Sequence, residues 1–118
     1  MITAGRTSQE VFQHHGEALG VEDLDAIVAD YADDAVFITR EGVVRGKDGI
    51  RQAFADLLGQ IPQAVWDIKS TVFEGDVLLL HWGAESANTR VDDGVDTFIF
   101  EDGLITLQTV NCTVTPKS

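Results

Sequence analysis

Residues 66–82 read WDIKSTVFEGDVLLLHW, and this stretch decides the fold class. Trp66, Ile68 and Val72 alternate with polar residues, which is the period of a strand with one face on the core and one in water. Glu74-Gly75-Asp76 has the composition of a tight turn, and the apolar run 77–80 begins the next strand. The pattern therefore predicts an antiparallel hairpin in the second half of the chain.

Two further turn signals continue this pattern toward the C-terminus. Asp92-Asp93-Gly94 and Glu101-Asp102-Gly103 both place glycine where a positive φ is often required. We expect the second strand of the hairpin to reach Asn88, and further strands over 95–100 and from 104 to about 115. Four successive strands joined by tight turns predict an antiparallel meander.

Upstream of the meander the apolar spacing changes to the helical period. Thr7-Ser8-Gln9-Glu10 matches a capping box, and the helix that it opens is expected to end at Gly20. A second helix begins near Asp23, carries Tyr31 on its apolar side and is closed by Asp33-Asp34. A strand over 35–39, a loop or small hairpin over 40–46 and a third helix from 47 or 48 to 58 follow. The order predicts one α+β domain over 1–118, with a core from about 8 to 113 and a curved antiparallel sheet carrying the helices on one face.

The composition excludes two classes of partner. The chain has 20 acidic and 8 basic residues among 118, a formal net charge of −12, and its Lys and Arg are scattered singly. Nucleic-acid binding needs clustered cations, and an anionic membrane surface would repel this charge. The single cysteine, Cys112, cannot form an internal disulfide, and no apolar run has the length of a signal peptide or a membrane span. We therefore expect a cytoplasmic protein with neither nucleic acid nor membrane as a partner.

Of the three histidines, His15 is the one that the helical period turns toward the core. Adjacent helix residues point about 100° apart, so His14 faces elsewhere. The pattern leaves two interpretations of His15 open: a core-edge histidine bonded to a backbone carbonyl, or a hydrogen-bond donor in a pocket. His14, His15 and His81 lack the i, i+4 spacing and the neighbouring cysteines of a metal site, so neither a metal nor another cofactor is expected.

Asp96 lies inside an apolar strand segment, where the period of two places it on one face with Phe98 and Phe100. A carboxylate among aromatic rings is costly to bury unless it is paired, protonated or facing a cavity. One interpretation is a strand-edge aspartate beside a turn. The other is a polar group in an apolar pocket, where a raised pKa would let it donate a hydrogen bond.

Three segments together resemble one family: DLDAIVADYADDAVF from Asp23 to Phe37, GKDGIRQAF from Gly46 to Phe54, and DTFIFEDG from Asp96 to Gly103. On these residues the chain is identified as a SnoaL-like member of the nuclear transport factor 2-like superfamily, which also contains ketosteroid isomerase. The resemblance covers about 8 to 113. It implies a cone-shaped, cystatin-like α+β barrel whose bent sheet wraps three helices around an apolar pocket, and a homodimer formed through the outer face of the sheet.

The resemblance also assigns positions. Asp96 falls on the protonated oxyanion-hole aspartic acid of the isomerase, and His15 falls on its oxyanion-hole tyrosine. Thr39 falls where that enzyme has its aspartate base, and a threonine cannot shuttle a proton between carbons at neutral pH. The last strand, GLITLQTV over 103–110, lacks the Glu, Trp and acid that cyclases often carry there. Both departures argue against the known isomerase and cyclase chemistries.

The residues and the resemblance together predict a pocket for a small hydrophobic carbonyl compound. His15 and Asp96 are the candidate catalytic residues, which would polarise a substrate oxygen and shuttle its proton. Thr39 and Gln108 are expected to orient the substrate or a water, and the apolar wall is expected to consist of Phe37, Phe54, Trp82, Phe98 and Val110. The activity stays open between a cofactor-independent isomerase, a cyclase or lyase, and a hydrolase. The alternative is a non-catalytic ligand-binding or dimeric assembly module of the same fold.

Overall fold

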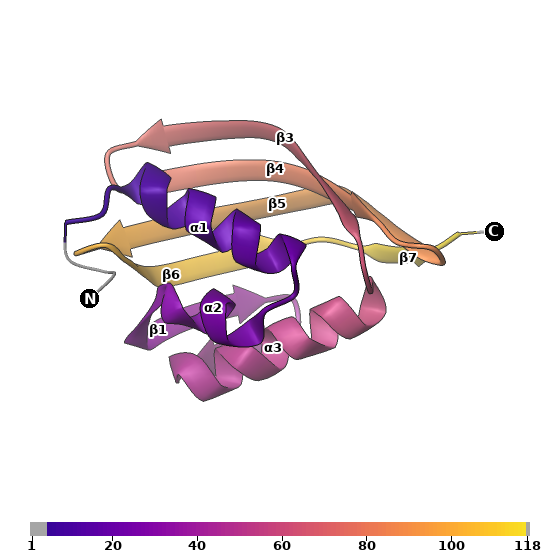
Figure 1. Cartoon of the computed structure of the whole chain (residues 1–118), viewed down its shortest axis with the longest axis horizontal. Helices are drawn as coiled ribbons and strands as arrows, with labels where there is room; N and C mark the ends of the chain where they lie inside the picture. The colour runs from indigo at the N-terminus through magenta and orange to yellow at the C-terminus, as the bar shows by residue number, and fades with distance from the viewer. Residues whose placement is uncertain (1–4, 118) are drawn as a thin grey trace.

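A curved sheet with helices against one face makes up the computed structural model, which describes residues 5–117 (Figure 1). The helices are α1 (Ser8–Gly20), α2 (Leu24–Ala29) and α3 (Gly46–Gln60). The strands are β1 (Tyr31–Thr39), β2 (Gly42–Arg45), β3 (Val65–Glu74), β4 (Val77–Glu85), β5 (Thr89–Glu101), β6 (Leu104–Asn111) and β7 (Val114–Pro116). None of the described helices is long and apolar enough to cross a membrane.

Helix α1 begins at the predicted capping box. The Thr7 hydroxyl accepts a hydrogen bond from the Glu10 N–H at 3.1 Å, and the Glu10 carboxylate accepts one from the Thr7 N–H at 2.8 Å. The helix then buries the face that carries Val11, His15 and Ala18. The prediction that His15 turns toward the core is confirmed.

The strand order is β2-β1-β6-β5-β4-β3, and β7 pairs with β5 beside this path. The predicted antiparallel meander is present from β3 to β6. Strand β1, however, pairs with β6 in parallel, so the sheet is mixed rather than wholly antiparallel. The strand expected over 104–115 is divided, because β6 ends at Asn111 and the chain starts again as β7. The parallel contact joins the N-terminal half of the chain to the meander.

The helical spacing predicted that Tyr31 belongs to the second helix. This prediction is wrong, because Tyr31 is the first residue of β1. Helix α2 ends at Ala29, and the Asp30 carbonyl then accepts a hydrogen bond from the Ile105 N–H at 2.7 Å. Asp33-Asp34, expected to close the helix, is exposed within β1 at a shift of the strand register. Pairing with the distant β6 therefore outweighs the local helical period.

Asp92-Asp93-Gly94 is not a turn, because these residues lie inside β5. Strand β4 ends at Glu85 rather than Asn88, and the connection lies at 86–88. Gly94 pairs with Trp82 across β4 and β5, and a Cβ added at Gly94 would lie 2.3 Å from an indole carbon. This glycine is needed for the close approach of a ring, which composition alone cannot distinguish from a turn signal.

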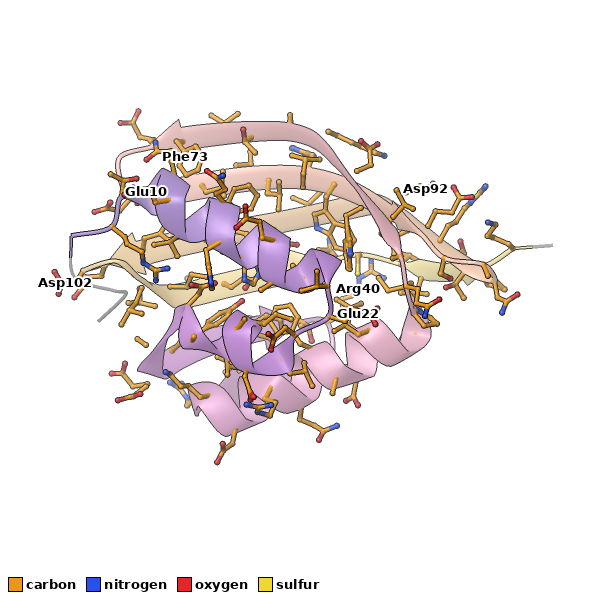
Figure 2. All side chains as sticks on the ribbon, in the orientation of Figure 1. Glu10, Glu22, Arg40, Phe73, Asp92 and Asp102 are labelled. Carbon is orange, nitrogen blue, oxygen red and sulfur yellow. The ribbon has the colours of Figure 1, made fainter. Side chains whose placement is uncertain are left out.

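Most acidic side chains lie at the periphery, whereas aromatic rings line the space between α1 and the sheet. Glu10, Asp92 and Asp102 are exposed at the outside of the molecule (Figure 2). Phe73 points from β3 toward α1, where its ring meets Phe12 edge-on with centroids 6.4 Å apart (Figure 2). The interior on this side of the sheet is therefore mainly apolar.

Candidate functional site

A cavity of about 530 Å³ lies between α1, α3 and the inner face of strands β3 to β6. The polar side chains that line it are those of Gln13, His15, Glu17, Asp96 and Gln108. The rest of the wall is mainly apolar, and includes Phe12, Leu19, Phe54, Leu57, Trp66, Leu80, Trp82, Phe98 and Val110. A volume of this size, lined mainly by apolar groups with a few polar ones, is typical of a small-molecule site.

Asp96 is held on the cavity wall by two donors. Its side chain lies on the inner face of β5 and the residue is 5% exposed. Oδ1 accepts a hydrogen bond from Trp82 Nε1 at 2.9 Å, and Oδ2 accepts one from Gln108 Nε2 at 3.0 Å. Burial raises the pKa of Asp96 from 3.8 to about 7, and the two hydrogen bonds oppose this rise. Near neutral pH the group therefore exists in both protonation states.

Gln108 is in turn held by Tyr31. The Tyr31 hydroxyl donates to Gln108 Oε1, and both side chains are buried, at 0% and 1% exposure. Burial raises the pKa of Tyr31 well above 10, and the nearby carboxylates of Asp96 and Asp30 raise it further, so the hydroxyl keeps its proton. Tyr31 was missed as a site residue because the helical period assigned it to the second helix, whereas it is the first residue of β1.

His15 reaches the same cavity from α1 and is 2% exposed. Its ring meets those of Tyr31, Phe54 and Phe98 edge-on, with centroids 5.6–5.7 Å apart. Nδ1 is buried without a hydrogen-bond partner, so it does not make the bond to a backbone carbonyl considered above. A charged ring would leave a buried N–H without an acceptor and is disfavoured for that reason. Burial lowers the pKa of His15 to about 4, although the Asp30 carboxylate opposes this. The imidazole is therefore neutral at physiological pH.

The two candidate catalytic groups have the reverse of their usual proton order. Free aspartate titrates well below free histidine, whereas here the pKa of Asp96 is about 7 and that of His15 about 4. Above pH 7 the pair consists of a carboxylate and a neutral imidazole, and no ion pair forms. Such a pair can combine a general base tuned to neutral pH with an uncharged N–H donor.

Asp30 forms a buried ion cluster that sequence reasoning missed. Its carboxylate is 0% exposed, accepts hydrogen bonds from Arg6 Nη1 at 3.0 Å and lies 2.8 Å from His14 Nδ1. Arg6 also donates to the Gly103 carbonyl at 2.8 Å. The cluster ties α1 to the end of α2 and to the β5–β6 turn. The local pattern does not distinguish Asp30 from the other acids of 22–34, and the end of α2 at Ala29 is what turns it inward.

The structure brings together most of the predicted site residues. His15, Phe54, Trp82, Asp96, Phe98, Gln108 and Val110 all line the cavity. The placement of Phe37 and Thr39 there is wrong, because both line a second cavity of about 560 Å³ bounded by α3, β1 and the end of β6. Thr39 bonds instead to its neighbour Glu41, accepting from the backbone N–H at 3.1 Å. Strand β1 lies on the side of β6 away from β5, so these side chains lie outside the His15 cavity.

A metal is not suggested by the side chains present. Within residues 5–117 no group of three or more His, Cys, Asp or Glu side chains is arranged to hold an ion. Cys112 lies by the second cavity, and burial raises the pKa of its thiol to about 11, so it is a poor nucleophile at neutral pH.

Replacing Gly94 with Ala is expected to displace the Trp82 ring and remove one donor from Asp96. An added Cβ would lie 2.3 Å from the indole, and Trp82 is only 4% exposed, so the ring has little room to move. Overpacking of this kind costs about 1–3 kcal/mol, which urea unfolding would measure. Gly59→Ala in α3 is the control, because its Cβ would meet nothing within 4 Å. Equal urea-unfolding midpoints for Gly94→Ala and Gly59→Ala would contradict this expectation.

In comparisons with known proteins the chain matches one family model and many solved structures of the same fold. The family model described as SnoaL-like domain matches residues 12–108. A SnoaL-like protein of unknown function from Burkholderia thailandensis superposes with a TM-score of 0.75 at 20% identity, over 90% of this chain and 94% of that one. An uncharacterized cystatin fold protein from Novosphingobium aromaticivorans gives 0.73 at 24% identity, over 90% and 98%.

A third solved structure is described as an LEH-like epoxide hydrolase from M. tuberculosis. It superposes with a TM-score of 0.71 at 21% identity, over 90% of this chain and 82% of that one. No curated protein sequence matches significantly. At such identities the structures speak for the fold alone, and they confirm the predicted α+β, cystatin-like class.

Proposed function

Since this chain belongs to the SnoaL-like domain family, as the sequence resemblance predicted, we propose that its cavity binds a small hydrophobic carbonyl compound and catalyses a proton transfer on it. Asp96 is the general base and His15 the hydrogen-bond donor to the substrate oxygen. The observation that carries the proposal is the pairing, inside an apolar cavity, of a carboxyl whose pKa is near 7 with a neutral imidazole. These two groups supply the acid–base chemistry without a cofactor.

The proposed step begins with the Asp96 carboxylate taking a proton from the carbon beside the carbonyl. The C–H electron pair moves into the carbonyl group, and the His15 N–H donates to the oxygen as negative charge collects there. We assign that proton to Nε2, because buried N–H groups without an acceptor are rarer than buried acceptors, and it is Nδ1 that lies unpaired.

Proton abstraction gives an enolate, and the next step of this enolate decides the reaction class. Return of the proton from Asp96 to a different carbon completes an isomerisation, whereas loss of a leaving group from the β carbon completes an elimination. Activation of a water by the same carboxylate would be a hydrolysis, the activity named for the epoxide hydrolase of the same fold. The proton-abstraction routes use both Asp96 and His15, and we favour them for that reason.

Deuterium exchange tests the proposal directly. The protein is incubated in D2O with a panel of hydrophobic ketones and enones, and deuterium at the carbon beside the carbonyl is followed by NMR. We expect exchange above the buffer rate, and the same rate for Thr39→Val, because Thr39 lies outside the cavity. Binding without exchange would assign the alternative, a non-catalytic ligand-binding module. A cavity that binds no compound of the panel, and from which native mass spectrometry recovers none, would overturn the proposal.

We also propose that two copies of the chain associate through the outer face of the sheet. Val72, Val77 and Leu79 of β3 and β4 are 58%, 41% and 40% exposed there, and Val72 lies opposite Leu79 in the strand pair. The neighbouring Thr97 and His81 bring no negative charge to the centre of this face, although the net charge of the chain is −12. Glu74 pairs with Val77 at one end of this face, so the uncharged part is its centre at Val72 and Leu79. An apolar patch of this kind on an acidic protein favours self-association.

Leu79→Lys is expected to shift the protein from dimer toward monomer. Two lysines placed in a symmetric interface oppose each other directly, so the dissociation constant should rise at least about tenfold. Sedimentation equilibrium measures this against the 12.8 kDa mass of one chain. Val21→Lys is the control, since Val21 is 75% exposed but lies between α1 and α2. A wild-type protein that stays monomeric would contradict the proposed dimer.

A further inference from the structure

Four buried side chains form one continuous run of hydrogen bonds beside the cavity. The Tyr31 hydroxyl donates to Gln108 Oε1, Gln108 Nε2 donates to Asp96 Oδ2 at 3.0 Å, and Trp82 Nε1 donates to Asp96 Oδ1 at 2.9 Å. The four residues come from β1, β6, β5 and β4, and each is at most 5% exposed. Water has little access to replace any of these bonds.

The direction of these bonds depends on the Gln108 amide. The indole of Trp82 can only donate, whereas a glutamine side chain presents an oxygen on one side and an NH2 group on the other. With Oε1 toward Tyr31, the NH2 group faces Asp96, which suits an ionised carboxylate. With the amide reversed, Oε1 would face Asp96 and would need a proton on Oδ2.

We propose that Tyr31 is a positioning residue for Asp96, because its hydroxyl holds the Gln108 amide in the orientation that favours the ionised, proton-accepting carboxylate. This inference deepens the proposed function and rests on it for the role of Asp96 as a base. The run of hydrogen bonds itself can be tested without any ligand.

Protonation of Asp96 has a cost under this arrangement. A protonated Oδ2 can donate to Gln108 only if the amide reverses, and Gln108 Nε2 then donates to the Tyr31 oxygen. The Tyr31 O–H is left without an acceptor, since within residues 5–117 the structure gives it no other partner than Gln108. An unmade bond of a buried hydroxyl disfavours that state, so Tyr31 draws the titration of Asp96 toward lower pH.

Other titratable groups near Asp96 do not obscure this titration. His15 faces the cavity from α1 and has a pKa of about 4, Cys112 lies beyond the end of β6 with a pKa of about 11, and the pKa of Tyr31 is well above 10. Glu17 lines the cavity from the exposed side of α1. His81 precedes Trp82 on β4 and faces the other side of the sheet, so the transition that reports Asp96 is the one that disappears in Asp96→Asn, whereas any signal change due to His81 would remain in that variant.

The indole N–H signals of the two tryptophans give the readout. In ¹⁵N–¹H spectra of the ligand-free protein recorded between pH 5 and 9, the Trp82 signal should move as Asp96 titrates, because Trp82 donates to it directly. Trp66 is the internal comparison, and Asp96→Asn should abolish the transition. In Tyr31→Phe we expect the midpoint to rise by about one pH unit, which corresponds to the net contribution of one intramolecular hydrogen bond. An unchanged midpoint in the folded variant overturns the inference.

A second measurement leaves the fold intact. The chain has a single tyrosine, so incorporation of 3-fluorotyrosine changes Tyr31 alone and makes its hydroxyl a stronger donor. We expect the Trp82 midpoint to fall, opposite to Tyr31→Phe, and the ¹⁹F signal to follow the same midpoint. A ¹⁹F signal that does not respond to the Asp96 transition overturns the inference. Deuterium exchange on ketones is a separate readout, so loss of the proposed function is distinguishable from failure of this inference.

Discussion

Asp96→Asn is expected to lower the rate of deuterium exchange on a bound ketone by about 10²–10⁴-fold, the usual contribution of a general base. An amide cannot accept the proton, yet it occupies the same space between Trp82 and Gln108. Reversal of the Gln108 amide would let Oε1 accept from the new NH2 group, so we expect the variant to fold. Asp67→Asn on β3 is the matched control, because Asp67 is exposed. A variant with undiminished exchange would show that Asp96 is not the base.

The same substitution is expected to stabilise the protein at alkaline pH. The pKa of Asp96 is about 7 in the folded state against an ordinary value of 3.8, so the folded state binds more protons than the unfolded state between about pH 4 and 7. The free energy of unfolding therefore falls as pH rises through that window. The whole difference corresponds to about 4 kcal/mol above pH 7, an order of magnitude that Asp96→Asn should recover in large part.

Urea unfolding at pH 5 and pH 8 measures this effect. The wild type should be less stable at pH 8 than at pH 5 by more than Asp96→Asn is, while Asp67→Asn should follow the wild type. If the two proteins lose stability equally between these pH values, the Asp96 carboxyl is not desolvated in the folded state. A stabilised but inactive variant would mark Asp96 as a site where function opposes stability.

Asp30→Asn is expected to cost about 2–4 kcal/mol of unfolding free energy at pH 7. Removing one partner of a buried ion pair costs about 3–5 kcal/mol, and we discount this because Arg6 and His14 are 16% and 39% exposed. The loss arises because Arg6 keeps its charge among groups that no longer neutralise it, although its bond to the Gly103 carbonyl remains.

Asp25→Asn serves as the comparison for the Asp30 prediction. Asp25 pairs with Arg51 at the surface, where the two side chains are 85% and 41% exposed, so its loss should cost less than about 1 kcal/mol. Urea unfolding of both variants under identical conditions gives the difference. Equal losses would mean that the Asp30 cluster contributes no more than a surface ion pair, and would contradict the placement of its carboxylate at 0% exposure.

Local pattern predicted the features that depend on one element at a time. The capping box begins α1, the helical period turns His15 rather than His14 inward, and the period of two places Asp96 with Phe98 on the inner face of β5. Each of these statements concerns the direction of a side chain relative to its own helix or strand. Backbone geometry alone sets that direction, so a short stretch of residues is enough to determine it.

Contacts between distant segments decided the remaining features. The parallel pairing of β1 with β6 ended α2 early, placed Tyr31 behind Gln108 and carried Thr39 away from the cavity. The burial of Asp30 follows from the same change. Gly94, a turn residue by composition, lies inside β5 because Trp82 needs the space above it. The sequence by itself thus determined most helices and strands and their inward faces, but not where α2, β4 and the last strand end. Only the tertiary structure decided which inward faces meet, because strand pairing depends on apolar surface buried across the whole chain rather than on any local period.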